Sequence, residues 1–125
     1  MSVSEKSKLY WLYKALIERK FTLCVTTDIL AEYAEILERH MGAEVSEDVM
    51  AVLETLKNVE IVTRYYEFRL LKDEDDDKFV DCAIAANASY IVSNDKDFNV
   101  LKSINFPVVK VIDVHKFKDD LFEVN

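Results

Sequence analysis

The chain has 125 residues, half of them hydrophobic, which is enough to bury one core without disulfides or a structural metal. Its formal net charge of −8 argues against a protein that holds nucleic acid by general electrostatic attraction, because phosphates would be repelled. An enzyme acting on nucleic acid is still compatible with this charge, since carboxylates packed into a metal site contribute to it and bound cations reverse it locally. We expect a single domain over residues 1–125.

The two cysteines, Cys24 and Cys82, match neither a disulfide framework nor a zinc-binding spacing. We expect two buried thiols in a reducing compartment. No segment has the length and apolarity of a membrane span, and residues 1–8 lack the apolar core of a secretory signal. The expected location is therefore the cytoplasm, without a membrane partner.

Helical and strand patterns alternate along the chain. The apolar spacing predicts, in order, a helix at 7–20, a strand at 21–26, helices at 27–41 and 46–57, a strand at 59–63, a helix at 73–88, a strand at 90–93, a helix at 96–104, a strand at 108–112 and a short terminal helix. Residues 64–72 fit neither pattern. The alternation predicts an α/β fold with a mostly parallel sheet between two layers of helices.

Gly42 is the only glycine, and it is expected to end the helix at 27–41. A glycine-rich dinucleotide turn and a P-loop both need several glycines, so this sequence can build neither. If the domain meets phosphates, we expect it to do so through a metal ion.

Asp76 has an unusual place on its predicted helix. At 100° per residue it lies on the axis of the apolar stripe, with Asp77 at the edge of the stripe and Asp81 beyond it. Burying an unpaired carboxylate is costly, so Asp76 needs a partner. A metal ion would be one.

Two further acids are expected near Asp76. Glu32 lies nearest the apolar stripe of its helix, and Asp95 follows the strand at 90–93, whose end should meet the start of the Asp76 helix. Open α/β sheets place their ligand crevice outside the C-terminal ends of the strands. Carboxylates meeting there suit Mg²⁺ or Mn²⁺, which prefer oxygen ligands.

Each acid also has a simpler explanation. Aspartates near a helix N-terminus favour the helix dipole, and Asp95 can cap the helix that follows it. For one residue alone the structural role is the better interpretation. The convergence of three separate segments favours the metal site.

Three motifs carry a resemblance to a known family: TTDILAEY at 26–33, DEDDDKF at 73–79 and YIVSNDKDF at 90–98. They resemble the later motifs of the PIN domain, specifically the toxin-like branch of prokaryotic toxin–antitoxin systems. The resemblance covers nearly the whole chain. It implies a PIN-like α/β/α fold and the hydrolysis of single-stranded RNA with Mg²⁺ or Mn²⁺.

Carried over by position, the resemblance implies catalytic and metal-binding roles for Glu32, Asp76 and Asp95. Asp77 and Asp97 would be auxiliary ligands. Ser93, where the family usually has threonine, would orient the site through a hydrogen bond. An antitoxin protein and a second copy of the chain are the implied protein partners.

The start of the chain departs from the family pattern. PIN domains open with a strand that ends in an aspartate, whereas residues 1–8 are polar and lead into the first predicted helix. We expect the N-terminal strand to be missing, and the gap to be closed by rearrangement, dimerisation or strand exchange. Metal affinity and turnover should both be weaker as a result.

Two other functions compete with a weak or inactive endoribonuclease. One is a catalytically degenerate PIN-like binding module or toxin–antitoxin partner, which the missing strand favours. The other is a phosphoacceptor signalling domain of similar topology, which is disfavoured because no suitable mid-sheet aspartate and late lysine are evident.

Aromatic residues lie close to basic residues in two segments and could stack on bases. The better interpretation is that they pack in a core or a dimer face. The two histidines are isolated and are expected on the surface or in packing roles. The residues concerned are Tyr10, Trp11, Tyr13, Tyr65 and Tyr66, with Lys14, Arg19, Lys20, Arg64 and Arg69, and the histidines His40 and His115.

Overall fold

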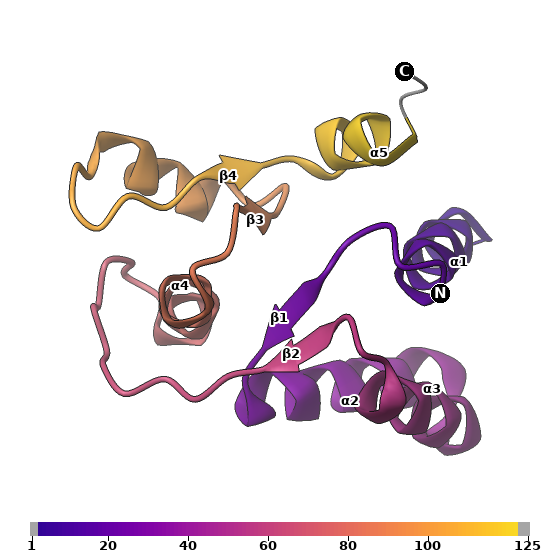
Figure 1. Cartoon of the computed structure of the whole chain (residues 1–125). Helices are drawn as coiled ribbons and strands as arrows, with labels where there is room; N and C mark the ends of the chain where they lie inside the picture. Colours follow the sequence, from indigo (N-terminus) through magenta and orange to yellow (C-terminus); the bar gives the residue numbers. More distant parts are fainter. Residues whose placement is uncertain (1–2, 123–125) are drawn as a thin grey trace. The chain divides into compact units, whose positions relative to one another are not determined.

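The structure, a computed structural model, describes residues 3–122 and separates into two units by its contacts, one ending at Ile61 and the other beginning at Val62. Each unit contains helices and one pair of parallel strands (Figure 1). The predicted α/β class with parallel strands is therefore confirmed. Among the described helices, none has both the length and the apolarity needed to cross a membrane.

The first unit contains three helices around a strand pair. Its elements are α1 (Val3–Ile17), β1 (Leu23–Val25), α2 (Thr27–Met41), α3 (Ala43–Thr55) and β2 (Val59–Ile61). β1 runs parallel to β2, with Leu23 opposite Val59. The helices α2 and α3 pack against each other (Figure 1). Val25 and Ile29 are the most buried large side chains of this unit, because β1 and the apolar stripe of α2 face inward.

The end of α1 is set by Arg19 rather than by a glycine. Arg19 adopts the left-handed conformation at φ 60°, and its N–H donates to the Leu16 carbonyl at 3.0 Å. The next N–H, of Lys20, donates to the Ala15 carbonyl at 3.0 Å. This pair of bonds closes the helix as a Schellman motif, which is why α1 ends at Ile17 and not at residue 20.

Gly42 separates α2 from α3 and serves both helices. Its N–H donates to the Glu38 carbonyl at 2.9 Å, and its own carbonyl accepts from the Ser46 N–H at 3.2 Å. At φ +92° it has a conformation that L side chains rarely adopt. Because Gly42 is itself the cap, α3 begins at Ala43, earlier than the predicted residue 46.

Asn58 joins the end of α1 to the strand pair. Its side-chain amide donates to the Leu16 carbonyl at 2.8 Å and to the Phe21 carbonyl at 2.9 Å. Both acceptors lie at the chain reversal that follows α1. The Leu16 carbonyl also accepts from the Arg19 N–H, so Asn58 adds a second donor there and links this reversal to the strand pair.

The second unit packs a long loop, a strand pair and three helical segments. Its elements are α4 (Glu74–Ala86), β3 (Ile91–Val92), the 3₁₀ helix η1 (Lys96–Ser103), β4 (Val111–Ile112) and α5 (Val114–Phe122). β3 runs parallel to β4, with Ile91 opposite Val111. The core contains Leu71, Val80, Phe98 and Leu101.

Two elements of this unit differ from the prediction. Residues 96–103 form a 3₁₀ helix, in which Phe98 and Leu101, three residues apart, are both buried. The predicted strand at 108–112 pairs only at Val111–Ile112, and Val108 is exposed. Only the last part of that segment finds a strand partner, in β3.

The cysteines follow the prediction in part. Cys82 is buried, Cys24 is half-buried, and both are free thiols. The Cys24 thiol donates to the Glu60 carboxylate at 3.6 Å across the β1–β2 pair. Burial and this acidic neighbour raise the pKa of Cys24, which favours the inert thiol over the thiolate.

Candidate metal centre

Three aspartates of the second unit come together at the start of α4 and at the end of β3. Asp76 lies in the first turn of α4, whereas Asp95 and Asp97 lie directly after β3, where η1 begins. One carboxylate oxygen from each lies within 4.8 Å of the others. We call these three residues, Asp76, Asp95 and Asp97, the acidic cluster.

The start of α4 places Asp76 in this cluster by giving the capping role to Asp73. The Asp73 carboxylate accepts from the Asp75 N–H at 2.9 Å, and its backbone carbonyl accepts from the Asp76 N–H at 3.1 Å. Asp76 is therefore not needed as a cap. It is half-buried, whereas Asp95 and Asp97 are exposed.

A short turn after β3 fixes the other two aspartates. Asp95 caps η1, and its Oδ1 accepts from the Asp97 N–H at 2.9 Å. The hydroxyl oxygen of Ser93 accepts from the Asp95 N–H at 3.0 Å. Ser93 thus contacts the backbone of Asp95, in keeping with the orienting role that the resemblance implies.

The acidic cluster carries an electrostatic cost. Burial, followed by the charges of neighbouring carboxylates, raises the pKa of Asp76 above its ordinary value. Those neighbours are Asp73, Asp95, Asp97 and Asp75. A cation would remove this cost, because it favours the charged form of all three cluster carboxylates.

The donor set of the acidic cluster fits a hard divalent cation. Carboxylate oxygens are the ligands that Mg²⁺ and Mn²⁺ prefer. Three such oxygens, one from each aspartate, lie within 4.8 Å of one another, so Asp76, Asp95 and Asp97 are the residues that would hold the ion.

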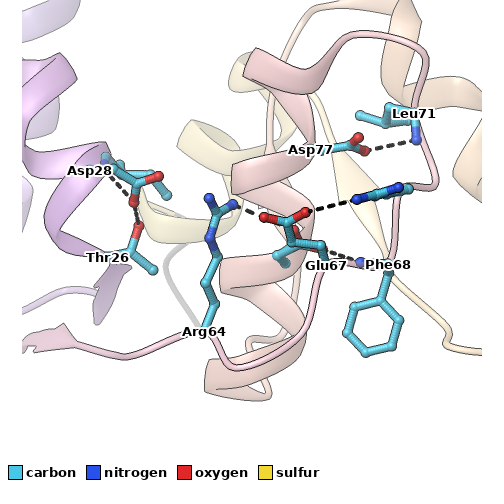
Figure 2. A network of polar contacts seen from close by, with 10 residues as sticks. Thr26, Asp28, Arg64, Glu67, Phe68, Leu71 and Asp77 are labelled. Carbon is cyan, nitrogen blue, oxygen red and sulfur yellow. Dashed lines mark hydrogen bonds and ion pairs between the residues drawn. The ribbon is translucent and has the colours of Figure 1, made fainter.

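Asp77 and Asp81 serve a different part of the unit. The Asp77 carboxylate accepts from the Leu71 N–H at 2.8 Å (Figure 2). The Asp81 carboxylate accepts from the Phe68 N–H at 3.1 Å and lies 3.5 Å from the Arg64 guanidinium. The two aspartates thus tie the loop before α4, residues 62–72, to the helix.

Asp81 corrects the predicted orientation of α4. It was expected beyond the apolar stripe, but it is 2% exposed, and Asp77 is also buried. Val80, at 0% exposure, lies between them along the inward face. The helix is rotated from the predicted orientation because the loop at 62–72 covers this side. The loop also supplies N–H donors to both buried carboxylates, which satisfies their hydrogen-bonding requirement.

Burial dominates the ionisation of Asp81. It raises the pKa of this carboxyl, although the Phe68 N–H and Arg64 both act in the opposite direction. Sequence reasoning missed Asp81 and Arg64 as a pair. The only signal was the i, i+4 spacing of Asp77 and Asp81, because their partners lie in a loop that has no regular pattern.

Glu32 lies on α2 in the first unit and is half-buried. It belongs to a different unit from the acidic cluster, so its predicted role in metal binding stays a prediction. Near the start of the same helix, the Thr26 hydroxyl donates to the Asp28 carboxylate, which also accepts from the Ile29 N–H at 3.1 Å (Figure 2). Asp28 therefore acts locally.

The aromatic residues do not all pack in a core. Tyr10, Tyr65 and Tyr66 are exposed, so for them only the dimer face of the two predicted packing roles stays a prediction, whereas Trp11 and Tyr13 are half-buried. Both histidines are exposed, as expected. His115 lies 3.4 Å from Asp119 on α5, and neither histidine belongs to the acidic cluster.

Comparisons with known proteins identify the family of the chain. Searches of curated proteins and of solved structures find no match. A family model described as PIN domain matches residues 1–97, a range that includes Glu32 and all three residues of the acidic cluster. Since the match covers well over half of the sequence, the chain belongs to the PIN domain family.

Proposed function

We propose that this PIN domain is a metal-dependent endoribonuclease that hydrolyses single-stranded RNA. The observation that carries the proposal is the acidic cluster, in which Asp76, Asp95 and Asp97 present carboxylate oxygens within 4.8 Å of one another. These oxygens would hold Mg²⁺ or Mn²⁺. When bound, such an ion supplies Lewis acidity, which makes water a stronger nucleophile and offsets negative charge on a phosphodiester.

The residues around the acidic cluster have distinct roles in this proposal. Asp76 brings a half-buried carboxylate from α4, and Asp95 and Asp97 bring exposed ones from the turn after β3. Ser93 positions Asp95 by accepting its N–H at 3.0 Å. Because the Asp97 N–H donates to Asp95 Oδ1, the Asp95 carboxylate is held against the backbone of Asp97.

Glu32 is proposed as a further catalytic and metal-binding residue on the basis of the family resemblance alone. Asp77, proposed from the same source as an auxiliary ligand, already accepts the Leu71 N–H at 2.8 Å. One of its oxygens is thereby used. We therefore give Asp77 a structural role first and a metal-binding role only through its second oxygen.

The biological setting is also part of the proposal. The chain would act in the cytoplasm as the toxin of a toxin–antitoxin pair, neutralised by an antitoxin protein and working as a homodimer. These finer statements come from the resemblance of the three motifs to the toxin-like branch. The family match supports the coarser statement that the chain is a PIN domain.

A binding module without catalysis is the second candidate. The observation that favours it is the composition of the acidic cluster. Among the described residues, the cluster contains three of the five predicted metal ligands, and Glu32 and Asp77 are not part of it. A site with fewer carboxylates binds its ion more weakly. Such a protein would bind RNA or an antitoxin and would cleave nothing.

A cleavage assay separates these candidates. Single-stranded RNA is incubated with the full chain, with Asp76→Asn and with Asp75→Asn, in Mn²⁺ or in EDTA. Asp75→Asn is the matched control, because it removes the same charge from the same helical turn at an exposed residue outside the acidic cluster. We expect Mn²⁺-dependent cleavage by the wild type and the control, and its loss in Asp76→Asn.

Two results would contradict the nuclease proposal. Cleavage that survives Asp76→Asn would remove the acidic cluster from the mechanism. Binding of RNA without cleavage by the wild type would favour the binding module. Glu32→Gln, tested in parallel by Mn²⁺ titration, should weaken Mn²⁺ binding if Glu32 contributes a ligand.

A further inference from the structure

A pocket of about 310 Å³ lies in the second unit where β3 and β4 end. Its lining includes Lys96, Lys102 and Lys116, and it shares Asp95 with the acidic cluster. Three lysines and two aspartates give the lining a formal charge of +1 (+3 − 2), in a chain whose formal net charge is −8. We call this site the lysine pocket.

The 3₁₀ geometry of η1 builds one wall of the lysine pocket. With about three residues per turn, side chains three residues apart lie above one another on the same face. Lys96, Asn99 and Lys102 have this spacing, and all three line the pocket. In an α-helix the same residues would drift around the axis by about 60° per step. The row of polar side chains is thus a product of the 3₁₀ helix.

The lysines of this row are available to a ligand. Among the residues that the structure describes, neither Lys96 nor Lys102 has an ion-pair or side-chain hydrogen-bond partner. Lys116 Nζ lies 3.2 Å from Asp120, in an exposed pair one helical turn apart. Exposed pairs of this kind contribute little free energy, so a stronger anion can replace Asp120.

The carboxylates in the lysine pocket are partly neutralised by backbone donors. Asp95 Oδ1 accepts from the Asp97 N–H at 2.9 Å, and Asp113 Oδ1 accepts from the Lys116 N–H at 2.7 Å. Asn94 accepts from the Val114 N–H at 3.0 Å, so it also serves the start of α5. With three lysines and two aspartates the lining has a formal charge of +1 (+3 − 2), and both aspartates already accept a backbone N–H.

We propose that the lysine pocket binds a phosphate group of the RNA strand next to the acidic cluster. This inference rests on the proposed function, since it assigns the substrate's position relative to that site. Lys96 and Lys102 would supply the charge, and Asn99 a hydrogen bond between them. Because Asp95 belongs to both sites, a neighbouring phosphodiester of the same strand would lie against the acidic cluster.

The test measures RNA binding apart from cleavage. A fluorescent short oligouridylate is titrated with the full chain carrying Asp76→Asn, in Mn²⁺, and its anisotropy is recorded at several salt concentrations. Lys96→Gln and Lys102→Gln are added singly and together. Lys110→Gln is the matched control, because Lys110 is an exposed lysine of the same unit that does not line the pocket.

We expect the double substitution to raise the Kd about tenfold and to reduce the slope of log K against log salt by about 0.7, the value for one phosphate contact on a single strand. Lys110→Gln should change the Kd less than about twofold, in the range of a distant surface charge. Thermal unfolding of each variant excludes misfolding. In the Asp76-intact chain, the double substitution should raise KM for RNA more than it lowers kcat.

Several results would overturn the lysine pocket. They are an unchanged Kd in the double variant, an equal effect of Lys110→Gln, and no RNA binding by the Asp76→Asn protein that carries no lysine substitution. The binding of an oligoglutamate peptide is measured in parallel. A double substitution that weakens peptide binding but not RNA binding would also overturn the proposal. Failure of the proposed function gives a different result, because the wild type would then not cleave RNA while the lysine-dependent binding persisted.

Discussion

The Leu71 N–H donates to the Asp77 carboxylate at 2.8 Å, one residue along α4 from Asp76, whose carboxylate lies with those of Asp95 and Asp97. Adjacent residues on a helix point about 100° apart, so neighbouring aspartates can serve separate sites. Asp76 lies in the acidic cluster, and Asp77 accepts from the loop backbone. Their substitutions should have opposite effects on stability.

Asp76→Asn should raise the melting temperature of the metal-free protein. It removes a carboxylate whose charge is disfavoured by burial and by four acidic neighbours. The amide keeps the shape and leaves the capping bonds of Asp73 in place. Thermal unfolding in EDTA measures the effect, and Asp75→Asn, which removes only the weakest of the four acidic neighbours, should raise the melting temperature less. A melting temperature below that of the wild type would contradict the view that repulsion dominates at this residue.

The advantage of Asp76→Asn should grow with pH. Because the pKa of Asp76 is raised in the native state, the native chain binds more protons than the unfolded chain between the two pKa values. Its contribution to stability is therefore lost as pH rises through that window. The difference in melting temperature between variant and wild type should widen as pH rises above the ordinary pKa of an aspartate. A difference that stays constant or narrows would rule out Asp76 as its source.

Added Mn²⁺ should stabilise the wild type, because a ligand that binds only the native state shifts the unfolding equilibrium. At about one hundred times the Kd, the free energy of unfolding should increase by about 2.7 kcal/mol. Asp76→Asn should lose most of this increase, whereas Asp75→Asn should retain it. Urea unfolding with and without Mn²⁺ is the measurement. Equal stabilisation of all three proteins would show that the ion binds elsewhere.

Asp81→Ala should destabilise the second unit without affecting Mn²⁺ affinity. The substitution leaves the Phe68 N–H and the Arg64 guanidinium without their buried acceptor. An unpaired buried donor costs about 1–3 kcal/mol. Urea unfolding gives the loss, and Mn²⁺ titration checks the separation of the two sites. A large drop in Mn²⁺ affinity would show that Asp81 supports the metal centre.

Arg64→Gln should raise the pKa of Asp81 further, because Arg64 is one of the two groups that lower it. The free energy of unfolding should then fall more steeply with pH than in the wild type, since the native state would hold the Asp81 proton to higher pH. Chemical shifts of the Asp81 carboxyl carbon report the titration directly. An unchanged titration midpoint would mean that the 3.5 Å pair has no electrostatic effect.

Asn58→Ala should destabilise the first unit by about 1–3 kcal/mol, because it removes the two hydrogen bonds that the Asn58 amide donates to the carbonyls of Leu16 and Phe21. Asn58→Asp is the sharper comparison, since it keeps the size of the side chain but replaces the donor with an acceptor. Both variants should melt below the wild type, with the aspartate lower. An aspartate variant as stable as the wild type would exclude these two bonds as the cause.

Much of the architecture could be read from the sequence because it follows from local periodicity. The apolar spacing of α2 and α4 and the short β-branched strands predicted the order of elements, and Gly42 marked the break between α2 and α3. The meeting of Asp76 with Asp95 also followed, because a helix that leads into a strand and the turn after that strand share one edge of the sheet. The order and direction of these elements are enough to bring the two residues together.

Other features could be known only from the tertiary structure, because they depend on contacts between segments that share no sequence pattern. The rotation of α4, which buries Asp81 and Asp77, is set by the loop at 62–72 and its N–H donors. The 3₁₀ geometry of η1, which aligns Lys96 with Lys102, depends on burying Phe98 and Leu101 together. Periodicity reports which residues are apolar, but only packing decides which face of a helix is covered and by what.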